Sequence, residues 1–308
     1  MVNETSSAQL QGYVTASYRY LRLSIIAVLL CLSVSVLIEH GRTHCWQGSI
    51  SAYYYTPVHS FFIGALVALA VGLIALKGAT EWEDVLFNVA GVLAAIVAFV
   101  PTSPPGADCA SAGFTTSSPS AFIDNNLLAL AIGGGVLILA IGVWALANRE
   151  DAREMLRPGP SLMGIVLGSG LFLAGLGWYV FFHDSFIDHA HGGGAVVLFL
   201  LIGVVVALNA IGTPRPGFRV GYIVVAAAMV LSVVAVMVGR AVRQGWRHQV
   251  LWLEILELGA LAAFWVLQTW EYWPIGVPTG VLRHQRSAQV AGRWAGRGRA
   301  APPDGRGE

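Results

Sequence analysis

Charged residues are scarce in this chain. Only 11% of its 308 residues are Asp, Glu, Lys or Arg, whereas 56% are hydrophobic. A soluble domain carries about 25% charged residues, so the composition indicates exposure to lipid rather than a large soluble core. The mean hydropathy of +0.67 agrees. The net charge is only +1, and the sole basic run is the C-terminal tail, so no extended nucleic-acid surface is expected.

Several familiar signatures are also absent from the sequence. No segment alternates apolar and polar residues with a period of two, which excludes the strands of a membrane barrel. No HExxH zinc motif occurs, and the glycine run 192–194 follows a histidine rather than a strand, so it is not a phosphate loop. Membrane-spanning segments must therefore be helices, because lipid offers the backbone no hydrogen-bond partners.

Long apolar stretches predict an all-α fold, a polytopic transmembrane helix bundle of about eight spans. An apolar stretch of about 17 or more residues can cross the hydrocarbon core as a helix. The first span is expected to be a retained anchor, because Glu39 and His40 follow it without a small-residue cleavage site. The expected spans are 21–38, 61–76, 85–100, 127–147, 162–182, 193–211, 220–238 and 250–270.

The basic residues predict that both termini are cytoplasmic. Cytoplasmic loops are enriched in Lys and Arg, and with the N-terminus inside, most of the 18 basic residues lie inside. The exceptions are Arg42, Arg240, Arg243 and Arg247. The chain then divides into a cytoplasmic N-terminal segment (1–18), an eight-helix transmembrane domain (19–273) and a basic cytoplasmic tail (274–308). The tail has no apolar period and is expected to be disordered. The expected location is a bacterial inner membrane.

This topology places every histidine except His284 at or near the outer face. Imidazole titrates near neutral pH and is a common metal ligand, so the outer face is the place to expect chemistry. The residues concerned are His40, His44, His59, His183, His189, His191 and His248.

Two glutamates provide the sharpest physical argument. Glu254 and Glu257 lie about 7–12 Å into the last span and share one helix face. A charge inside the bilayer is costly, so such residues face the bundle interior and find partners. Either they belong to a functional cluster, or they lie in the headgroup layer or serve as protonated structural acceptors.

The segment 183–191 is read as the loop between spans five and six. It contains His183, Asp188, His189 and His191. A loop can bring His183, His189 and His191 to one divalent metal ion, with zinc the natural choice. The alternative is a set of interfacial polar residues that cap the two spans.

Tyrosines and cysteines add two further candidates. Tyr54 belongs to a run of three tyrosines before the second span, which forms either an interfacial aromatic belt or the rim of a pocket. Cys45 and Cys109 occupy the two longest outer loops, where an oxidising compartment permits a disulfide. Unpaired thiols are the alternative.

Four segments resemble a family of uncharacterised bacterial multi-pass membrane proteins that is distantly similar to the Frag1/DRAM/Sfk1 group. They are 49–64 (SISAYYYTPVHSFFIG), 83–102 (EDVLFNVAGVLAAIVAFVPT), 191–199 (HGGGAVVLF) and 254–265. The resemblance covers most of the bundle. The resemblance marks His191 and either Glu254 or Glu257 as candidate functional residues. It implies no established activity.

The leading hypothesis is a non-enzymatic membrane protein with an outward-facing pocket for a small ligand, a lipid headgroup or a cation. The pocket residues would be His59, His183, Asp188, His191, Glu254 and Glu257, with Tyr54 at the rim. One alternative is a metal-dependent hydrolase acting on lipid, which a weaker similarity to such membrane enzymes also suggests, although their His-x3-His pair is missing. Another is a proton-coupled transporter. The only expected partners are the lipid bilayer and this ligand; no nucleic acid is expected.

The disulfide can be tested by counting free thiols. If Cys45 and Cys109 pair, alkylation of the denatured, unreduced chain modifies only Cys31, and reduction exposes all three cysteines to the reagent. Intact-mass spectrometry counts the added groups, and Cys45→Ser should free Cys109 for modification. Three modified cysteines before reduction would contradict the pairing.

Overall fold

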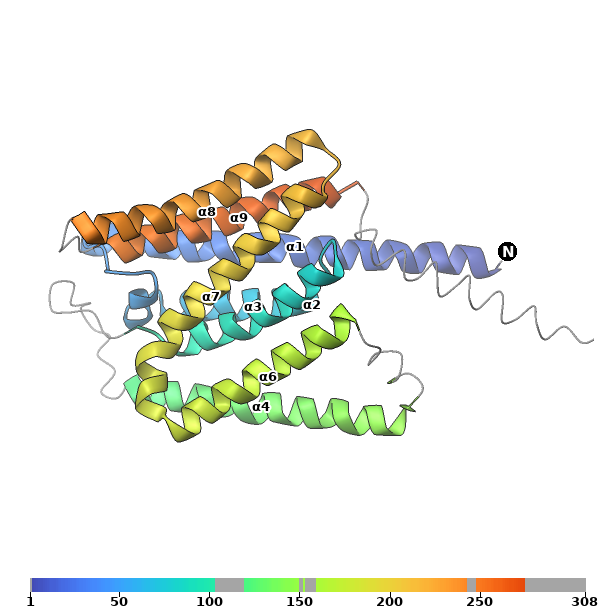
Figure 1. The fold of residues 1–308 in the computed structure, drawn as a ribbon, viewed down its shortest axis with the longest axis horizontal. Helices are drawn as coiled ribbons and strands as arrows, with labels where there is room; N and C mark the ends of the chain where they lie inside the picture. The colour runs from blue at the N-terminus through green and yellow to red at the C-terminus, as the bar shows by residue number, and fades with distance from the viewer. Residues whose placement is uncertain (1, 103–118, 150–151, 153–158, 243–247, 275–308) are drawn as a thin grey trace, which may run out of the picture.

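Every element that the structure describes is a helix. The computed structural model describes residues 2–102, 119–149, 152, 159–242 and 248–274, and these ranges contain no strand. Figure 1 shows the helices as a bundle. They are α1 (Val2–Thr43), the short 3-10 helix η1 (Ser51–Tyr55), α2 (His59–Ala75), α3 (Glu81–Phe99), α4 (Pro119–Ala147), α6 (Pro160–Phe181), α7 (His183–Gly212), α8 (Pro216–Val242) and α9 (Gln249–Tyr272).

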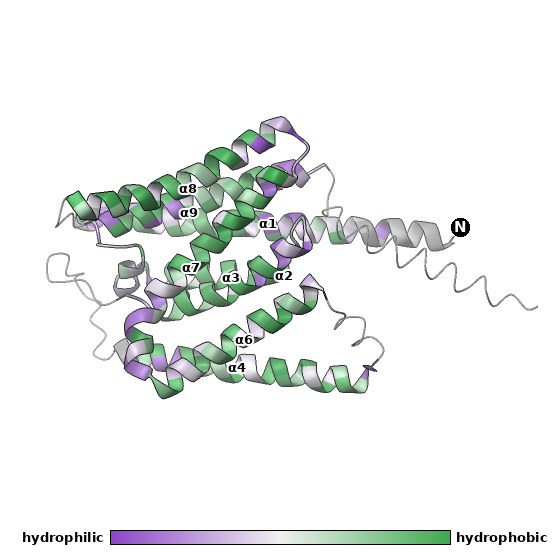
Figure 2. Cartoon of the chain, in the orientation of Figure 1, coloured by the Kyte–Doolittle hydropathy of each residue, from purple (hydrophilic) through white to green (hydrophobic). Residues whose placement is uncertain are grey.

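The predicted all-α membrane bundle is confirmed. Seven of the described helices are long and apolar enough to cross a membrane. The eighth predicted span corresponds to α2, an apolar helix of only 17 residues. Each of the eight predicted segments overlaps one of these helices. Apolar residues follow the middle of the helices and polar residues gather towards their ends (Figure 2).

The first helix is much longer than the predicted span. α1 has 42 residues, which corresponds to about 60 Å at 1.5 Å per residue. That is about twice the thickness of the hydrocarbon core, so its N-terminal part extends beyond the other helices (Figure 1).

α3 occupies the centre of the bundle and α4 its edge. Half of the most apolar window of α3 is buried, and α3 packs against α2, α6 and α7. Only 6% of the corresponding window of α4 is buried, so its apolar side chains face lipid. α8 and α9 pack against each other, and α9 also contacts α1.

The bundle has two chemically different ends. The helix ends and connections at one end of the bundle carry seven histidines, and we name it the histidine end: His40, His44, His59, His183, His189, His191 and His248. Six described basic residues belong to the helix ends and connections at the other end (Figure 1), which we name the arginine end: Arg19, Arg22, Lys77, Arg149, Arg215 and Arg219. His284 and the tail residues 275–308 lie outside the described residues. The predicted gathering of the histidines at one end is therefore confirmed.

Small residues let α2 and α3 approach closely. A Cβ atom on Gly91 would lie 2.6 Å from Cγ1 of Ile74 and 2.8 Å from the carbonyl oxygen of Ala70. The second neighbour is backbone and cannot move aside without displacing α2. Close approach at small residues is a common way for membrane helices to associate.

Gly91→Ala should therefore destabilise the bundle. Overpacking a close contact costs about 1–3 kcal/mol, which thermal unfolding of the purified protein in detergent would report as a lower Tm. Gly64→Ala on α2 is the matched control, because a Cβ atom there has nothing within 4 Å. Equal melting temperatures for the two variants would contradict this account of the α2–α3 contact.

Candidate functional site

The segment 183–191 is not a loop, and in this respect the sequence prediction is wrong. α7 begins at His183, so the segment forms its first turns. Phe186 and Ala190 are buried against Val100, Ile123 and Leu127, and this apolar packing stabilises the helical conformation. Residues two apart on a helix point in different directions, so His189 and His191 do not share a face.

The residues of this segment have separate environments. His189 is exposed, and its ring Nδ1 donates to the carbonyl of Ser185 at 3.0 Å. Asp188 is also exposed, whereas His191 is buried. Across the part of the chain that the structure describes, no three His, Cys, Asp or Glu residues lie close enough together to hold a metal ion.

Two of the predicted site residues line a common cavity at the histidine end. His191 of α7 and Glu254 of α9 border a cavity of about 40 Å³, together with Ser51 of η1. The remaining wall is apolar and comes from α1, α2, α3, α7 and α9, and from Ile50, which precedes η1. It consists of Leu32, Ile50, Phe62, Leu66, Leu69, Val97, Ala195, Leu198, Phe199, Leu258 and Leu261.

His191 joins α7 to the end of α3. Its Nδ1 donates to the carbonyl oxygen of Val100 at 2.6 Å, and Val100 follows the last residue of α3. The last carbonyls of a helix lack partners within the helix, so His191 satisfies one of them. Because Nδ1 carries the proton, Nε2 is the acceptor nitrogen of the neutral ring.

Glu254 joins α9 to the segment that precedes η1. Its carboxylate accepts a hydrogen bond from the backbone amide of Ile50. One turn earlier in α9, the amide of Leu251 donates to the carbonyl of Gly48 at 3.0 Å. The neighbouring Ser51 is also hydrogen-bonded, because its hydroxyl oxygen lies 2.8 Å from that of Thr102. The carboxylate is thus held in place by backbone contacts, and Glu254 is one of the residues that line the cavity.

Glu257 faces a different helix. Its Oε1 accepts from the hydroxyl of Ser232 on α8 at 2.6 Å, and the side chain is buried. Its Oε2 is also buried and has no hydrogen-bond partner among the described residues. The expected orientation into the bundle is therefore found, but the two glutamates do not form one cluster: Glu257 does not border the cavity.

His59 and Tyr54 lie beside the cavity rather than in it. The Nδ1 atom of His59 donates to the carbonyl of Tyr54 at 2.7 Å, and their rings are 4.3 Å apart. Tyr54 is buried and contacts Phe62, which lines the cavity. The neighbouring Tyr55 donates to the carbonyl of Thr102 at 3.0 Å. Burial, with a smaller contribution from Tyr54, raises the pKa of Tyr55 to about 12, so its hydroxyl remains a donor at neutral pH.

His183 belongs to a second polar group that the sequence did not suggest. Its Nε2 lies 3.0 Å from Oδ1 of Asp124 on α4, which also accepts from the Tyr179 hydroxyl at 2.8 Å. Asp184 is 3.5 Å from the other ring nitrogen. His183 does not border the cavity that His191 and Glu254 share. Asp124 precedes the predicted span 127–147 by three residues, and an acid at that position is the signal in the sequence that points to this group.

Cys45 is described and Cys109 is not. Cys45 is half-buried two residues after α1. Cys109 lies outside the described residues, so their pairing stays a prediction.

A buried polar network joins four helices at the arginine end, where the basic residues of the sequence predict only the orientation of the chain. Arg22 is 1% exposed, and its Nη1 donates to Oε1 of Gln268 at 2.8 Å. The amide of Gln268 in turn donates to Asn209 at 3.0 Å and to Glu83 at 3.5 Å. Gln268 thus connects α1, α3, α7 and α9. The signal in the sequence was two polar residues, Asn209 and Gln268, within the inner turns of apolar spans.

Comparisons with known proteins reveal no relative. No family model, no curated protein and no solved structure matches this chain.

The network at Gln268 should contribute strongly to stability. Gln268→Leu leaves Arg22, Glu83 and Asn209 each short of a buried partner, and one unsatisfied buried group costs about 1–3 kcal/mol. Thermal unfolding in detergent should show a clearly lower Tm. Thr269→Val is the control on the same helix, because the buried Thr269 hydroxyl has no partner among the described residues, and removing it should be neutral or stabilising. A similar loss in both variants would contradict the importance of the network.

Proposed function

We propose that this integral membrane protein binds a small ammonium group in the cavity at the histidine end, without covalent chemistry. One observation supports this most directly: Glu254 and His191 border a cavity whose wall is otherwise apolar apart from Ser51. A small cavity with few polar groups among apolar side chains is typical of a ligand site.

The chemistry of the lining favours a positively charged hydrogen-bond donor. A buried carboxylate is costly unless it is paired. The amide of Ile50 meets part of this need, and an ammonium group provides the opposite charge and further N–H donors. Ser51 and the acceptor nitrogen of His191 are additional acceptors of the kind that orient such a group.

The size of the cavity restricts the ligand. About 10–15 Å³ of such volume holds one water molecule, so a cavity of about 40 Å³ accommodates only a few heavy atoms. An alkylammonium group meets this limit. It comes either from a small soluble amine or from the headgroup of an aminophospholipid.

We further propose that the histidine end faces outward and the arginine end faces the cytoplasm of a bacterial inner membrane. The enrichment of Lys and Arg on one side supports this orientation. The relationship to the uncharacterised membrane protein family also stays a proposal, as do the lipid-hydrolase and transporter hypotheses.

Ligand binding should raise the stability of the folded protein. At about 100 times the Kd, a ligand of the folded state stabilises by about 2.7 kcal/mol. Thermal unfolding of the full chain in detergent with added ethanolamine should show this as a higher Tm, whereas tetramethylammonium, which lacks N–H donors, should have no effect. Glu254→Gln should abolish the shift, and Glu257→Gln should retain it, because Glu257 does not border the cavity.

A second arm distinguishes the two sources of the ammonium group. The protein is placed in nanodiscs of phosphatidylethanolamine or of phosphatidylcholine, which differ in the N–H donors of the headgroup. Stabilisation by ethanolamine in detergent, together with equal stability in the two lipids, indicates a soluble ligand. Stabilisation only in phosphatidylethanolamine, lost in Glu254→Gln, indicates the lipid. No response in either arm would overturn the proposed function.

A further inference from the structure

A buried cation and a buried carboxylate are held apart at the arginine end. Arg22 and Glu83 are each 1% exposed. Among the described residues, the carboxylates within 4 Å of a basic side chain belong to Asp84, Asp124 and Asp184, and Glu83 is not one of them. The Gln268 amide lies between Arg22 and Glu83 and bonds to both. Burying two charges without direct contact is unfavourable, so this arrangement calls for a physical explanation.

Only one of the two groups can change its charge. A guanidinium remains protonated in proteins, whereas a carboxyl group can lose its charge by accepting a proton. An ionisable residue in a membrane-spanning segment is a functional candidate by default, because its burial is costly. Glu83 is therefore the member of the pair that can switch between two states.

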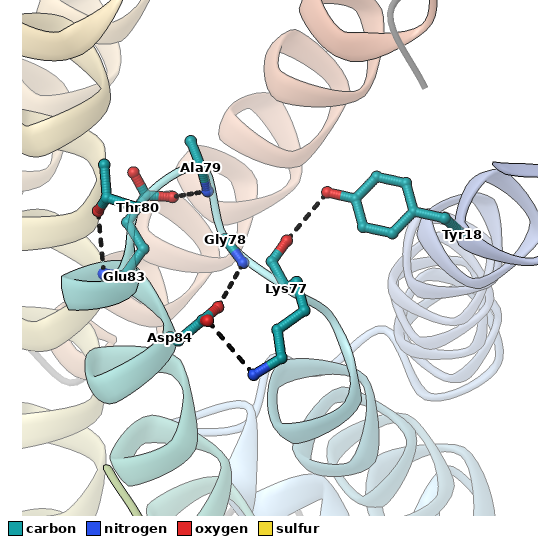
Figure 3. Close-up of polar contacts among 7 residues, drawn as sticks. All are labelled: Tyr18, Lys77, Gly78, Ala79, Thr80, Glu83 and Asp84. Atoms are coloured by element: carbon teal, nitrogen blue, oxygen red, sulfur yellow. Dashed lines mark hydrogen bonds and ion pairs between the residues drawn. The ribbon is translucent and has the colours of Figure 1, made fainter. Parts of the chain in front are cut away.

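The turn between α2 and α3 separates Glu83 from the end of the bundle. The amide of Ala79 donates to Oε2 of Glu83 at 2.9 Å, and the Glu83 amide donates to the hydroxyl of Thr80 at 3.2 Å (Figure 3). A Cβ atom on Gly78 would lie 2.5 Å from Cβ of Glu83, so the backbone of the turn packs directly on this side chain. Lys77, in the same turn, is 54% exposed. Glu83 is thus separated from the surface by one backbone segment.

The turn is held in place by two further contacts. Asp84 accepts from the Gly78 amide at 2.6 Å and lies 3.3 Å from Nζ of Lys77. The hydroxyl of Tyr18 donates to the carbonyl of Lys77 at 3.0 Å, as Figure 3 also shows. The same hydroxyl accepts from Nη2 of Arg22 at 2.5 Å.

These bonds close a ring. From Glu83 it passes through Gln268, Arg22 and Tyr18 to the carbonyl of Lys77, and it returns through the Ala79 amide to the same Oε2 atom of Glu83. Two of its hydrogen bonds end on the Glu83 carboxylate. Protonation would weaken both, because a carboxylate accepts hydrogen bonds more strongly than a carboxylic acid.

Other charged and polar groups surround Glu83. Tyr18 and Arg22 come from α1, Lys77 from the turn after α2, Glu81 and Asp84 from α3 itself, Asn209 from α7, and Gln268, Glu271 and Tyr272 from α9. The Glu271 carboxylate has its own partners, Thr213 and Tyr222. Of the acids nearby, Asp84 is paired with Lys77, which leaves Glu83 as the group whose protonation affects the ring.

We propose that Glu83 is a proton-binding site that opens to the arginine end, and that its protonation releases the 77–80 turn. None of the residues in this ring lines the cavity at the histidine end. In the deprotonated state the carboxylate holds the turn closed over Arg22 and Gln268. In the protonated state the turn loosens and exposes this polar interior to water.

Hydrogen exchange of the turn tests the proposal. Exchange of a peptide covering 77–84 is measured by mass spectrometry on the full chain in lipid nanodiscs, at an acidic and an alkaline pH, and corrected for the intrinsic pH dependence of exchange. The corrected rate in the turn should be about fivefold or more higher in acid, since one hydrogen bond of ordinary strength is lost. No corrected difference in the wild-type protein would overturn the proposal.

Two variants assign the effect to one carboxyl group. Glu83→Gln should exchange fast at both pH values, because its neutral amide imitates the protonated acid. Asp84→Asn, on the same turn of α3, should keep the pH dependence. Infrared difference spectra between the two pH values should show a protonated-carboxyl band that Glu83→Gln removes and Asp84→Asn retains. A pH-dependent turn in Glu83→Gln, or an unchanged band, would contradict the assignment, and the wild-type measurement decides the matter if Glu83→Gln does not fold.

Discussion

Lipid offers no hydrogen-bond partner, and the structure depends on this constraint. Each polar group that enters the bundle must find a partner inside the protein or accept a cost of several kcal/mol. Backbone groups meet the requirement by forming helices. Polar side chains meet it by bonding between helices, as Gln268 does with Arg22, Glu83 and Asn209. Polar contacts in the membrane interior therefore also determine which helices are neighbours.

The same constraint explains why the two ends differ. At the histidine end, His191 and Glu254 bond to backbone groups of neighbouring segments and border a largely apolar cavity. At the arginine end, side chains bond to one another across helices as well as to backbone groups. The first arrangement leaves a cavity that Glu254 lines, and the second joins four helices through hydrogen bonds. We therefore propose ligand binding at the first end and proton binding at the second.

The fold could largely be predicted from the sequence, because a segment that crosses lipid must be a long apolar helix. Length and apolar content locate each helix, and the alternating direction of successive spans places the histidines together. The site was harder to predict. Glu254 is singled out by its depth in the last predicted span, and His191 by its place at the outer face and by the family resemblance. The segment 183–191, which contains His191, is predicted as a loop because its polar residues mask the apolar contacts of Phe186 and Ala190. Spacing along the chain cannot show contacts between helices, so the role of Asp124 with His183 was missed.

The arginine network was missed for a related reason. Arg22 was used only to orient the chain, since a basic residue near the end of a span normally reaches the interface. Its burial depends on Tyr18, Trp265 and Gln268, which surround the guanidinium from α1 and α9. No pattern within α1 alone reveals partners that lie more than 200 residues later in the chain.

The continuity of α1 has a mechanical consequence. One unbroken helix provides Tyr18 and Arg22 to the arginine end and Leu32 to the cavity wall, so these positions lie about 15–21 Å apart at 1.5 Å per residue. A helix of this kind behaves as a stiff rod, because bending it would break backbone hydrogen bonds in lipid. Any tilt of α1 that shifts Tyr18 must also shift Leu32. A rigid α1 therefore transmits a movement of its arginine-end residues to the wall of the cavity at the histidine end.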